Sequence, residues 1–138
     1  MKRILSLFLI LSALFFAVGV SFASPDGADP PIVLKVKKKE GNNYSLDLEL
    51  PPNYGFQKDA PHRVLVSGSG GLKVEKADLN LSGPVHPKKA EYYEYVKPLS
   101  LQLKGKGDLE ISAKLFYCDF KKNICIPGKV SRKIQIVD

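Results

Sequence analysis

Residues 109–136, LEISAKLFYCDFKKNICIPGKVSRKIQI, decide the fold of this chain. Apolar and polar residues alternate along the first part of this stretch, and the alternation returns near its end, a period of two that is typical of strands. The pattern predicts strands at Glu110–Cys118 and Val130–Val137, joined across a short segment that holds the second cysteine. The end of the chain is therefore expected to form an antiparallel hairpin.

The hairpin holds the only two cysteines in the chain, Cys118 and Cys125. Cys118 has the parity of the polar residues Glu110 and Lys114, and Cys125 is out of phase with the isoleucines that flank it. Residues of one parity share one face of a strand, so both sulfurs are predicted to point away from the core and toward each other. Such a pair fits the geometry of a cross-strand disulfide.

The rest of the chain predicts more short strands between turns rich in glycine and proline. They are expected at 32–37, 44–50, 63–67, once or twice within 72–83, and in two segments of 91–103 around Pro98, with loops at 53–62 and 84–90. About seven to nine short strands favour an all-β chain that folds as an antiparallel β-sandwich. An antibody-type domain is excluded, because there is no tryptophan and both cysteines lie in one hairpin.

The N-terminus predicts export. Lys2 and Arg3 precede an apolar stretch at 4–20, and Ser21-Phe22-Ala23 follows as a small-x-small cleavage site, the pattern of a secretory signal peptide. We therefore expect a signal peptide at 1–23 cut after Ala23, a flexible leader at 24–31, and one domain at 32–138. The alternative is an uncleaved anchor, since the apolar run is near the lower length limit of a membrane span. A cleaved chain is expected to be periplasmic or otherwise exported, without a membrane span, and monomeric.

The chain is basic, with a formal net charge of +7. Its lysines are scattered in short groups, Lys37-Lys38-Lys39, Lys88-Lys89, Lys104 with Lys106, and Lys121-Lys122. We interpret them as solvated surface that keeps strand edges apart, with a patch for an anionic ligand as the alternative. No nucleic-acid-binding motif accompanies the charge, so nucleic acid is not an expected partner.

The residues alone leave two interpretations of the cysteine pair. It is a structural disulfide, the common state of two cysteines in a small exported domain, worth about 2 kcal/mol by loop closure. Alternatively it is a redox couple, since an exposed bridge is open to an attacking thiolate and nearby lysines such as Lys121 and Lys122 favour one, although Asp119 opposes them.

The hairpin LFYCDFKKNICIPGKVSRKIQI, residues 115–136, resembles the C-terminal hairpin of the N-terminal periplasmic domain of thiol:disulfide interchange protein DsbD. In that family a strand ends in a cysteine, a loop of similar length follows, and a second cysteine precedes a proline and the last strand. NYGFQKDAP at 53–61 and EYYEYVKPLSLQL at 91–103 also resemble segments of these domains. The resemblance spans Ile32 to Ile136.

The resemblance implies an immunoglobulin-like sandwich in a standalone secreted copy. Cys118 and Cys125 would be the site residues, carrying electrons between a membrane electron-conduit protein and thioredoxin-fold proteins, with no cofactor. The family shields its cysteines with a Phe-Tyr-Gly cap loop, a tripeptide that does not occur here. Candidates to replace this cap are Tyr92, Tyr93, Phe116 and Phe120. The alternative function is an envelope interaction module with a static disulfide.

Other candidate sites are weaker. His62 and His86 both lie beside prolines and are expected to be loop residues with ordinary hydrogen bonds. A metal site of these histidines and the two thiolates is the alternative, but their spacing matches no zinc pattern.

The three tyrosines Tyr92, Tyr93 and Tyr95 are expected to pack on a sheet, and the alternative is a strip that binds sugar or peptide. No serine lies in a nucleophile-elbow pattern, so we expect no small-molecule catalytic site.

Overall fold

The structure, a computed structural model, describes residues 30–137. The predicted signal peptide at 1–23 and most of the predicted leader at 24–31 lie outside these residues. The described part consists of strands and loops and contains no helix, so it has none long and apolar enough to cross a membrane. The strands in chain order are β1 (Val33–Lys38), β2 (Asn43–Glu49), β3 (Tyr54–Phe56), β4 (Arg63–Ser69), β5 (Lys73–Asp78), β6 (Leu99–Lys104), β7 (Gly107–Asp119) and β8 (Ile124–Ile136).

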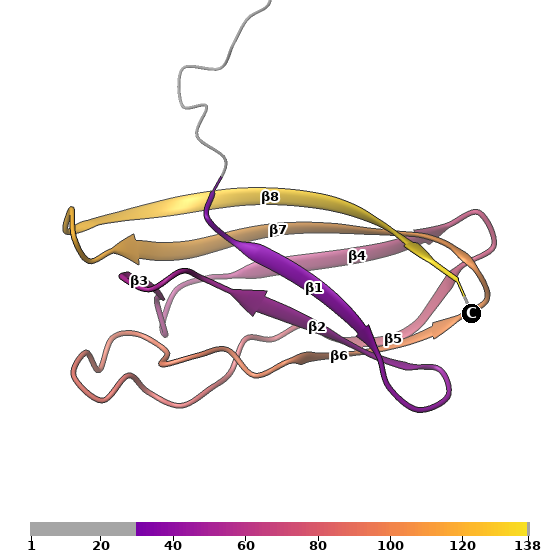
Figure 1. Ribbon diagram of the computed structural model, residues 1–138, viewed down its shortest axis with the longest axis horizontal. Coiled ribbons are helices and arrows are strands. Elements are labelled where there is room, and N and C mark those ends of the chain that lie inside the picture. Colours follow the sequence, from indigo (N-terminus) through magenta and orange to yellow (C-terminus); the bar gives the residue numbers. More distant parts are fainter. Residues whose placement is uncertain (1–29, 138) are drawn as a thin grey trace, which may run out of the picture.

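The eight strands form two antiparallel sheets that pack as a sandwich, which confirms the predicted fold class (Figure 1). One sheet has the order β1-β2-β6-β5. In the other sheet β7 is central: β8 pairs with it on one side, and β3 and β4 pair with successive parts of it on the other. The immunoglobulin-like form implied by the resemblance stays a prediction.

The core lies between the sheets and follows the alternation of the sequence. β6 buries Leu99, Leu101 and Leu103 in turn, and β7 buries every second residue from Leu109 to Leu115. Complete burial of such a side chain contributes about 1.5–3 kcal/mol. The two cysteine sulfurs belong to neither of these inward rows, so the hydrophobic core is built without them.

Two predictions about the loops are wrong. Tyr54–Phe56, expected in a loop, is the short strand β3, which pairs with the end of β7. Residues 91–97, expected as a strand, form only isolated bridges through Tyr92 and Tyr93. The reason lies in backbone hydrogen bonds, because the amides of Lys89 and Tyr92 close tight turns and are lost to any ladder. Residues 84–95 thus form an irregular arm that folds back over the edge of β3, and we call it the arm.

β8 begins earlier than expected, at Ile124, so that Cys125 lies in the strand itself. Pro127 is accommodated because, within the described part of the chain, β8 pairs only with β7 and has no strand partner on its other edge. The turn between β7 and β8 contains Asn123 in the left-handed region, with a φ of 52°, a conformation that asparagine adopts more readily than most residues. The hairpin is therefore regular on both sides of a very short turn.

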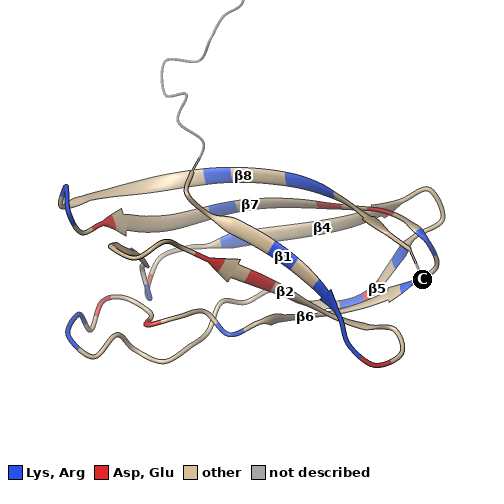
Figure 2. Cartoon of the chain, viewed as in Figure 1, with Lys and Arg blue, Asp and Glu red and all other residues tan. Residues whose placement is uncertain are grey.

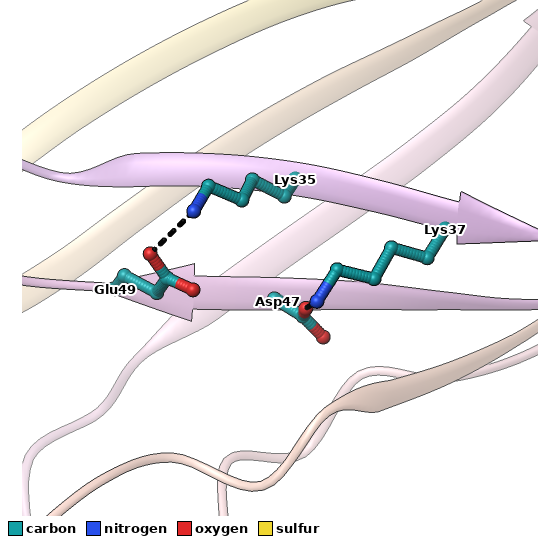
Figure 3. A network of polar contacts seen from close by, with 4 residues as sticks. All are labelled: Lys35, Lys37, Asp47 and Glu49. Atoms are coloured by element: carbon teal, nitrogen blue, oxygen red, sulfur yellow. Dashed lines mark hydrogen bonds and ion pairs between the residues drawn. The ribbon is translucent and has the colours of Figure 1, made fainter.

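The outer face of the first sheet is charged and internally paired. Lys35 Nζ lies 2.9 Å from Glu49 Oε2, and Lys37 Nζ lies 2.7 Å from Asp47 Oδ2, both across β1 and β2 (Figure 3). The hydrogen bond to Asp47 raises the pKa of Lys37. The positive charges of Lys35 and Lys37 are therefore largely balanced by these carboxylates.

Candidate functional site: the disulfide and its aromatic cover

The site is built on directly opposed positions of β7 and β8. Cys118 pairs with Cys125 in the strand register, their Cα atoms are 3.9 Å apart, and their sulfurs form a disulfide. The predicted cross-strand bridge is thus confirmed. Because it joins neighbouring strands next to a short turn, it adds a local crosslink to a hairpin that the ladder already holds.

The face of the sheet is also as predicted, but the exposure of Cys118 is not. Leu115 and Tyr117 point into the core, and Cys118 points to the opposite, outer face. An outward position in an exposed hairpin predicts an accessible sulfur, whereas Cys118 is only 2% exposed. Strand parity gives the face of a side chain and says nothing of what covers that face. Here the arm covers it.

The cover consists of two aromatic rings from different segments. Tyr92 of the arm packs edge to face against Phe120 of the β7–β8 turn, with ring centroids 5.0 Å apart and an interplanar angle of 82°. Lys89 places its ammonium 4.0 Å from the centroid of the Phe120 ring, and His86 lies edge-on to the same ring. Cation–π and aromatic contacts of this kind hold the arm against the turn. Of the four candidates for a cap, Tyr92 and Phe120 fill the role.

Gly55 makes room for this cover. It lies in β3 directly opposite Cys118. A Cβ atom at position 55 would lie 2.6 Å from Phe120 Cζ and 3.4 Å from Tyr92 Cδ1. No larger residue fits unless the Phe120 ring moves. The glycine of the NYGF stretch therefore matters to the site because it has no side chain, which leaves space for the Phe120 ring beside Cys118.

The hydroxyl of Tyr92 reaches both sulfurs. It donates a hydrogen bond to Cys118 Sγ at 3.2 Å and lies 3.8 Å from Cys125 Sγ. A disulfide sulfur is a weak acceptor, but a thiolate is a strong one, and a hydrogen bond to the charged form stabilises that form. The hydroxyl is thus in position to stabilise a thiolate at Cys118 when the disulfide opens.

The two cysteines differ in their access to solvent. Cys125 is exposed, and it lies between Ile124 and Ile126, which are 46% and 38% exposed although both are apolar. Cys118 is buried beneath Tyr92. A reagent in solution therefore meets Cys125 first. The two isoleucine side chains lie on the opposite face of β8, so they leave the sulfur open.

Asp119 fixes the turn next to the bridge. Its side chain is buried, and Oδ1 accepts hydrogen bonds from the backbone amides of Lys121 at 2.9 Å and Lys122 at 3.2 Å. This side-chain turn explains why a carboxylate can follow Cys118 directly. The negative charge of Asp119 is thus stabilised by hydrogen bonds from two amides of the turn.

Both histidines lie in loops with ordinary hydrogen bonds, as expected. His62 Nε2 is 2.6 Å from the carbonyl oxygen of Gln57, and Nδ1 accepts the amide of Phe116 at 3.1 Å, so the ring is neutral with its proton on Nε2. Burial lowers the pKa of His62. His86 Nδ1 accepts the amide of Lys88. Within residues 30–137, no three histidine, cysteine or acidic residues are grouped to hold a metal ion.

The three tyrosines of the arm have different roles. Tyr92 contacts the sulfurs, whereas Tyr93 packs against the core and donates hydrogen bonds to the carbonyls of Leu81 and Lys58. Tyr95 is exposed and lines a cavity of about 340 Å³ beside β2 and β3. Sequence reasoning named Tyr92 as one of four cap candidates but had no signal for its contact with Cys118, because the two residues are 26 positions apart.

With this geometry established, the chain was compared with known proteins. No protein-family model matches it, and a search of curated proteins returns no match. The resemblance to the DsbD domain thus rests on the residues quoted above. Function has to be argued from the site itself.

Proposed function

We propose that this protein is an exported thiol–disulfide exchange carrier whose Cys118 and Cys125 alternate between dithiol and disulfide. Its partners are a thioredoxin-fold protein and a membrane electron-conduit protein. One observation carries the proposal: the bridge has one exposed sulfur and one buried sulfur, and the buried one is hydrogen-bonded by Tyr92. A purely structural crosslink needs no such difference between its two ends.

The chemistry follows from this difference. A thiolate of a partner dithiol attacks Cys125 Sγ, the Cys118–Cys125 bond breaks, and Cys118 leaves as a thiolate under the Tyr92 hydroxyl. The partner's second thiolate then attacks its own sulfur in the mixed disulfide and releases Cys125. The partner ends as a disulfide, and this protein has gained two electrons and two protons. The reverse sequence oxidises it again.

The N-terminal pattern supports the compartment that the proposal requires. A charged start, an apolar run and Ser21-Phe22-Ala23 are the features of a secretory signal peptide. Disulfides form and persist outside the cytosol, where an exchange carrier has oxidised partners to react with. We propose the periplasm as its location and the immunoglobulin-like sandwich of the DsbD domain as its fold family.

The first test is the reduction potential of the bridge, measured by equilibrating the protein in thiol buffers and trapping free thiols. We expect a value between about −120 and −270 mV, the range of known oxidoreductases of the thioredoxin class. A value below about −300 mV marks structural disulfides. It would overturn the carrier and favour the interaction module with a static bridge.

A matched pair of variants tests the roles of the two sulfurs. Cys118→Ser leaves Cys125 alone and exposed, and Cys125→Ser leaves Cys118 alone beneath Tyr92. We expect the first variant to form a mixed disulfide with an aromatic disulfide reagent at least about tenfold faster, because access of the reagent to the thiolate controls the rate. Equal rates would contradict the assignment of Cys125 as the attacked sulfur.

A further inference from the structure

The end of the sandwich that carries the disulfide is surrounded by unpaired positive charge. Four lysines contribute to it, two from the arm and two from the β7–β8 turn, and we call them the basic collar: Lys88, Lys89, Lys121 and Lys122. All four are exposed. Figure 2 shows basic segments in both the turn and the arm, at the same end of the molecule.

Contacts join the two halves of the collar around the bridge. The ammonium of Lys89 lies over the Phe120 ring, which packs on Tyr92, and the Tyr92 hydroxyl lies 3.8 Å from Cys125 Sγ. Lys122 is three residues before Cys125, so the extended chain would place their Cα atoms at most about 10 Å apart. That distance is close to the screening length at physiological salt. The exposed sulfur therefore lies within the field of the collar.

The collar is not neutralised locally. Among residues 30–137 none of its four lysines forms an ion pair, whereas Lys35 and Lys37 on the outer face of the first sheet are paired with carboxylates (Figure 3). Asp119, the carboxylate in the turn, is buried and directed to backbone amides. The arm carries two exposed carboxylates, Glu91 and Glu94. The four lysines of the collar outnumber them.

The apolar neighbours of Cys125 lie on the other face of β8. Ile124 and Ile126 are partly exposed, but alternation along the strand turns their side chains away from the sulfur. The charged collar is therefore the main feature of the surface around the sulfur. Charge on the rim of an interface mainly determines which partner arrives and how fast, and contributes less to how tightly it is held.

We infer that the basic collar selects thiol partners that present an acidic face around their reactive sulfur. This inference rests on the proposed exchange function and names the charge of its partner. A negatively charged partner is concentrated near Cys125 before attack, and a positively charged one is repelled. Mutual attraction brings the two sulfurs together.

The experiment uses three small thiols of different charge as probes: 2-mercaptoethanesulfonate, 2-mercaptoethanol and cysteamine, which are anionic, neutral and cationic beside the thiol. The rate of bridge reduction, normalised to thiolate concentration, is measured for the native protein and for K88E/K89E/K121E/K122E. The ratio of native to variant rates removes the intrinsic reactivity of each thiol. A matched control, K38E/K39E/K73E/K104E, makes the same change of charge at the opposite end of the sandwich.

We expect the native-to-variant ratio to be about tenfold larger for the anionic thiol than for the cationic one at low salt. At an ionic strength of about 1 M, where the screening length is about 3 Å, the difference should vanish. The control variant should behave like the native protein. The milder K88Q/K89Q/K121Q/K122Q should give an intermediate ratio, and it keeps the test usable if the charge-reversed protein does not fold.

The outcomes separate this inference from the proposed function. If no thiol reduces the bridge, exchange itself fails. If all three thiols reduce it with equal ratios, or if the control variant shifts the ratios as much as the collar variant, exchange stands and the collar inference is overturned. An anionic membrane could also bind the collar, and cosedimentation with phosphatidylserine vesicles tests this. Binding to the vesicles that is lost in the collar variant would show that the collar recognises a membrane and would overturn the inference of an acidic protein partner.

Discussion

Tyr92 links the arm to the disulfide through a single oxygen atom. The sequence predicts Tyr92 in a strand, which is wrong, and offers it as one of four candidates for a cap. Its contact with Cys118 could not be foreseen, because it depends on how the arm folds over β3. Parity predicted the direction of both sulfurs, since that is a local property of a strand. The direction of a side chain could thus be predicted where it depends on neighbours in the sequence, whereas a contact between distant segments could not.

Tyr92→Phe should slow exchange without loosening the cover. The variant keeps the ring against Phe120 and removes only the hydroxyl that stabilises the Cys118 thiolate. A hydrogen bond to a charged group contributes about 1.5–3 kcal/mol, so we expect reduction by dithiothreitol to be roughly tenfold or more slower. Tyr93→Phe is the matched control, because its hydroxyl binds backbone carbonyls. Unchanged rates in Tyr92→Phe would remove this residue from the mechanism.

His62 should make stability depend on pH. Burial lowers its pKa, and a proton on Nδ1 would break the bond from the Phe116 amide. The unfolded chain then takes up a proton at a higher pH than the folded one. Stability is therefore complete above the ordinary histidine pKa of about 6.5 and is lost as pH falls through the lowered folded value, by at most about 1.4 kcal/mol per pH unit.

Urea denaturation at a series of pH values measures this dependence. His62→Gln should flatten the slope between about pH 7 and 5, because glutamine does not titrate in this range. His86→Gln is the control, since His86 is in another loop, where its Nδ1 accepts the amide of Lys88 and its ring packs on Phe120. A slope that survives in His62→Gln would show that another group is responsible.

β3 is the element that the sequence could not reveal and on which the site depends most directly. β3 is only three residues long, which is too short for an alternation of buried and exposed side chains to be recognised in the sequence. It is a strand because its backbone pairs with the end of β7. The opposite error occurred in 91–97, where alternating aromatics resemble a strand but the turns of the arm prevent a ladder. Long strands were predictable because burial repeats along them; short elements were not.

Gly55→Ala should open the cover from the side of β3. The added methyl would meet the Phe120 ring at 2.6 Å, so this ring, which packs on Tyr92, must move. We expect a loss of about 1–3 kcal/mol of stability, typical of overpacking, and faster alkylation of Cys118 in a Cys125→Ser background. In a double-mutant cycle, Phe120→Leu should reduce the cost of Gly55→Ala. Additive costs would place the strain elsewhere.

At the scale of the whole molecule, the residues that stabilise the fold are different from those that form the disulfide. The core is formed by leucine, isoleucine and valine rows that do not include the sulfurs, and the sandwich architecture was predictable from those rows alone. The sequence left the function of the bridge undecided, because a static crosslink and an exchange couple share the same cysteine spacing. What bears on that choice, the unequal exposure of the two sulfurs, arises only when all segments are assembled.

Cys118→Ala/Cys125→Ala should therefore fold. We expect a native-like β-sheet circular dichroism spectrum and a stability lower by about 2 kcal/mol or less, because the bridge closes only a short loop. Chemical denaturation of the native protein with and without reductant gives the same comparison. Unfolding of the variant at ambient temperature would identify the bridge as a structural requirement and would count against a couple that opens in every cycle.

The open edge of β8 has a consequence for self-association. Among residues 30–137 only β7 pairs with β8, so about every second residue of the thirteen-residue strand directs unpaired main-chain groups to its free side, a template on which another copy could polymerise. Pro127 lacks an amide donor, and Lys129 and Arg132 place like charges along the strand. Two copies aligned edge to edge would bring these charges together. The strand that carries Cys125 thus resists fibre formation by electrostatic repulsion between identical copies.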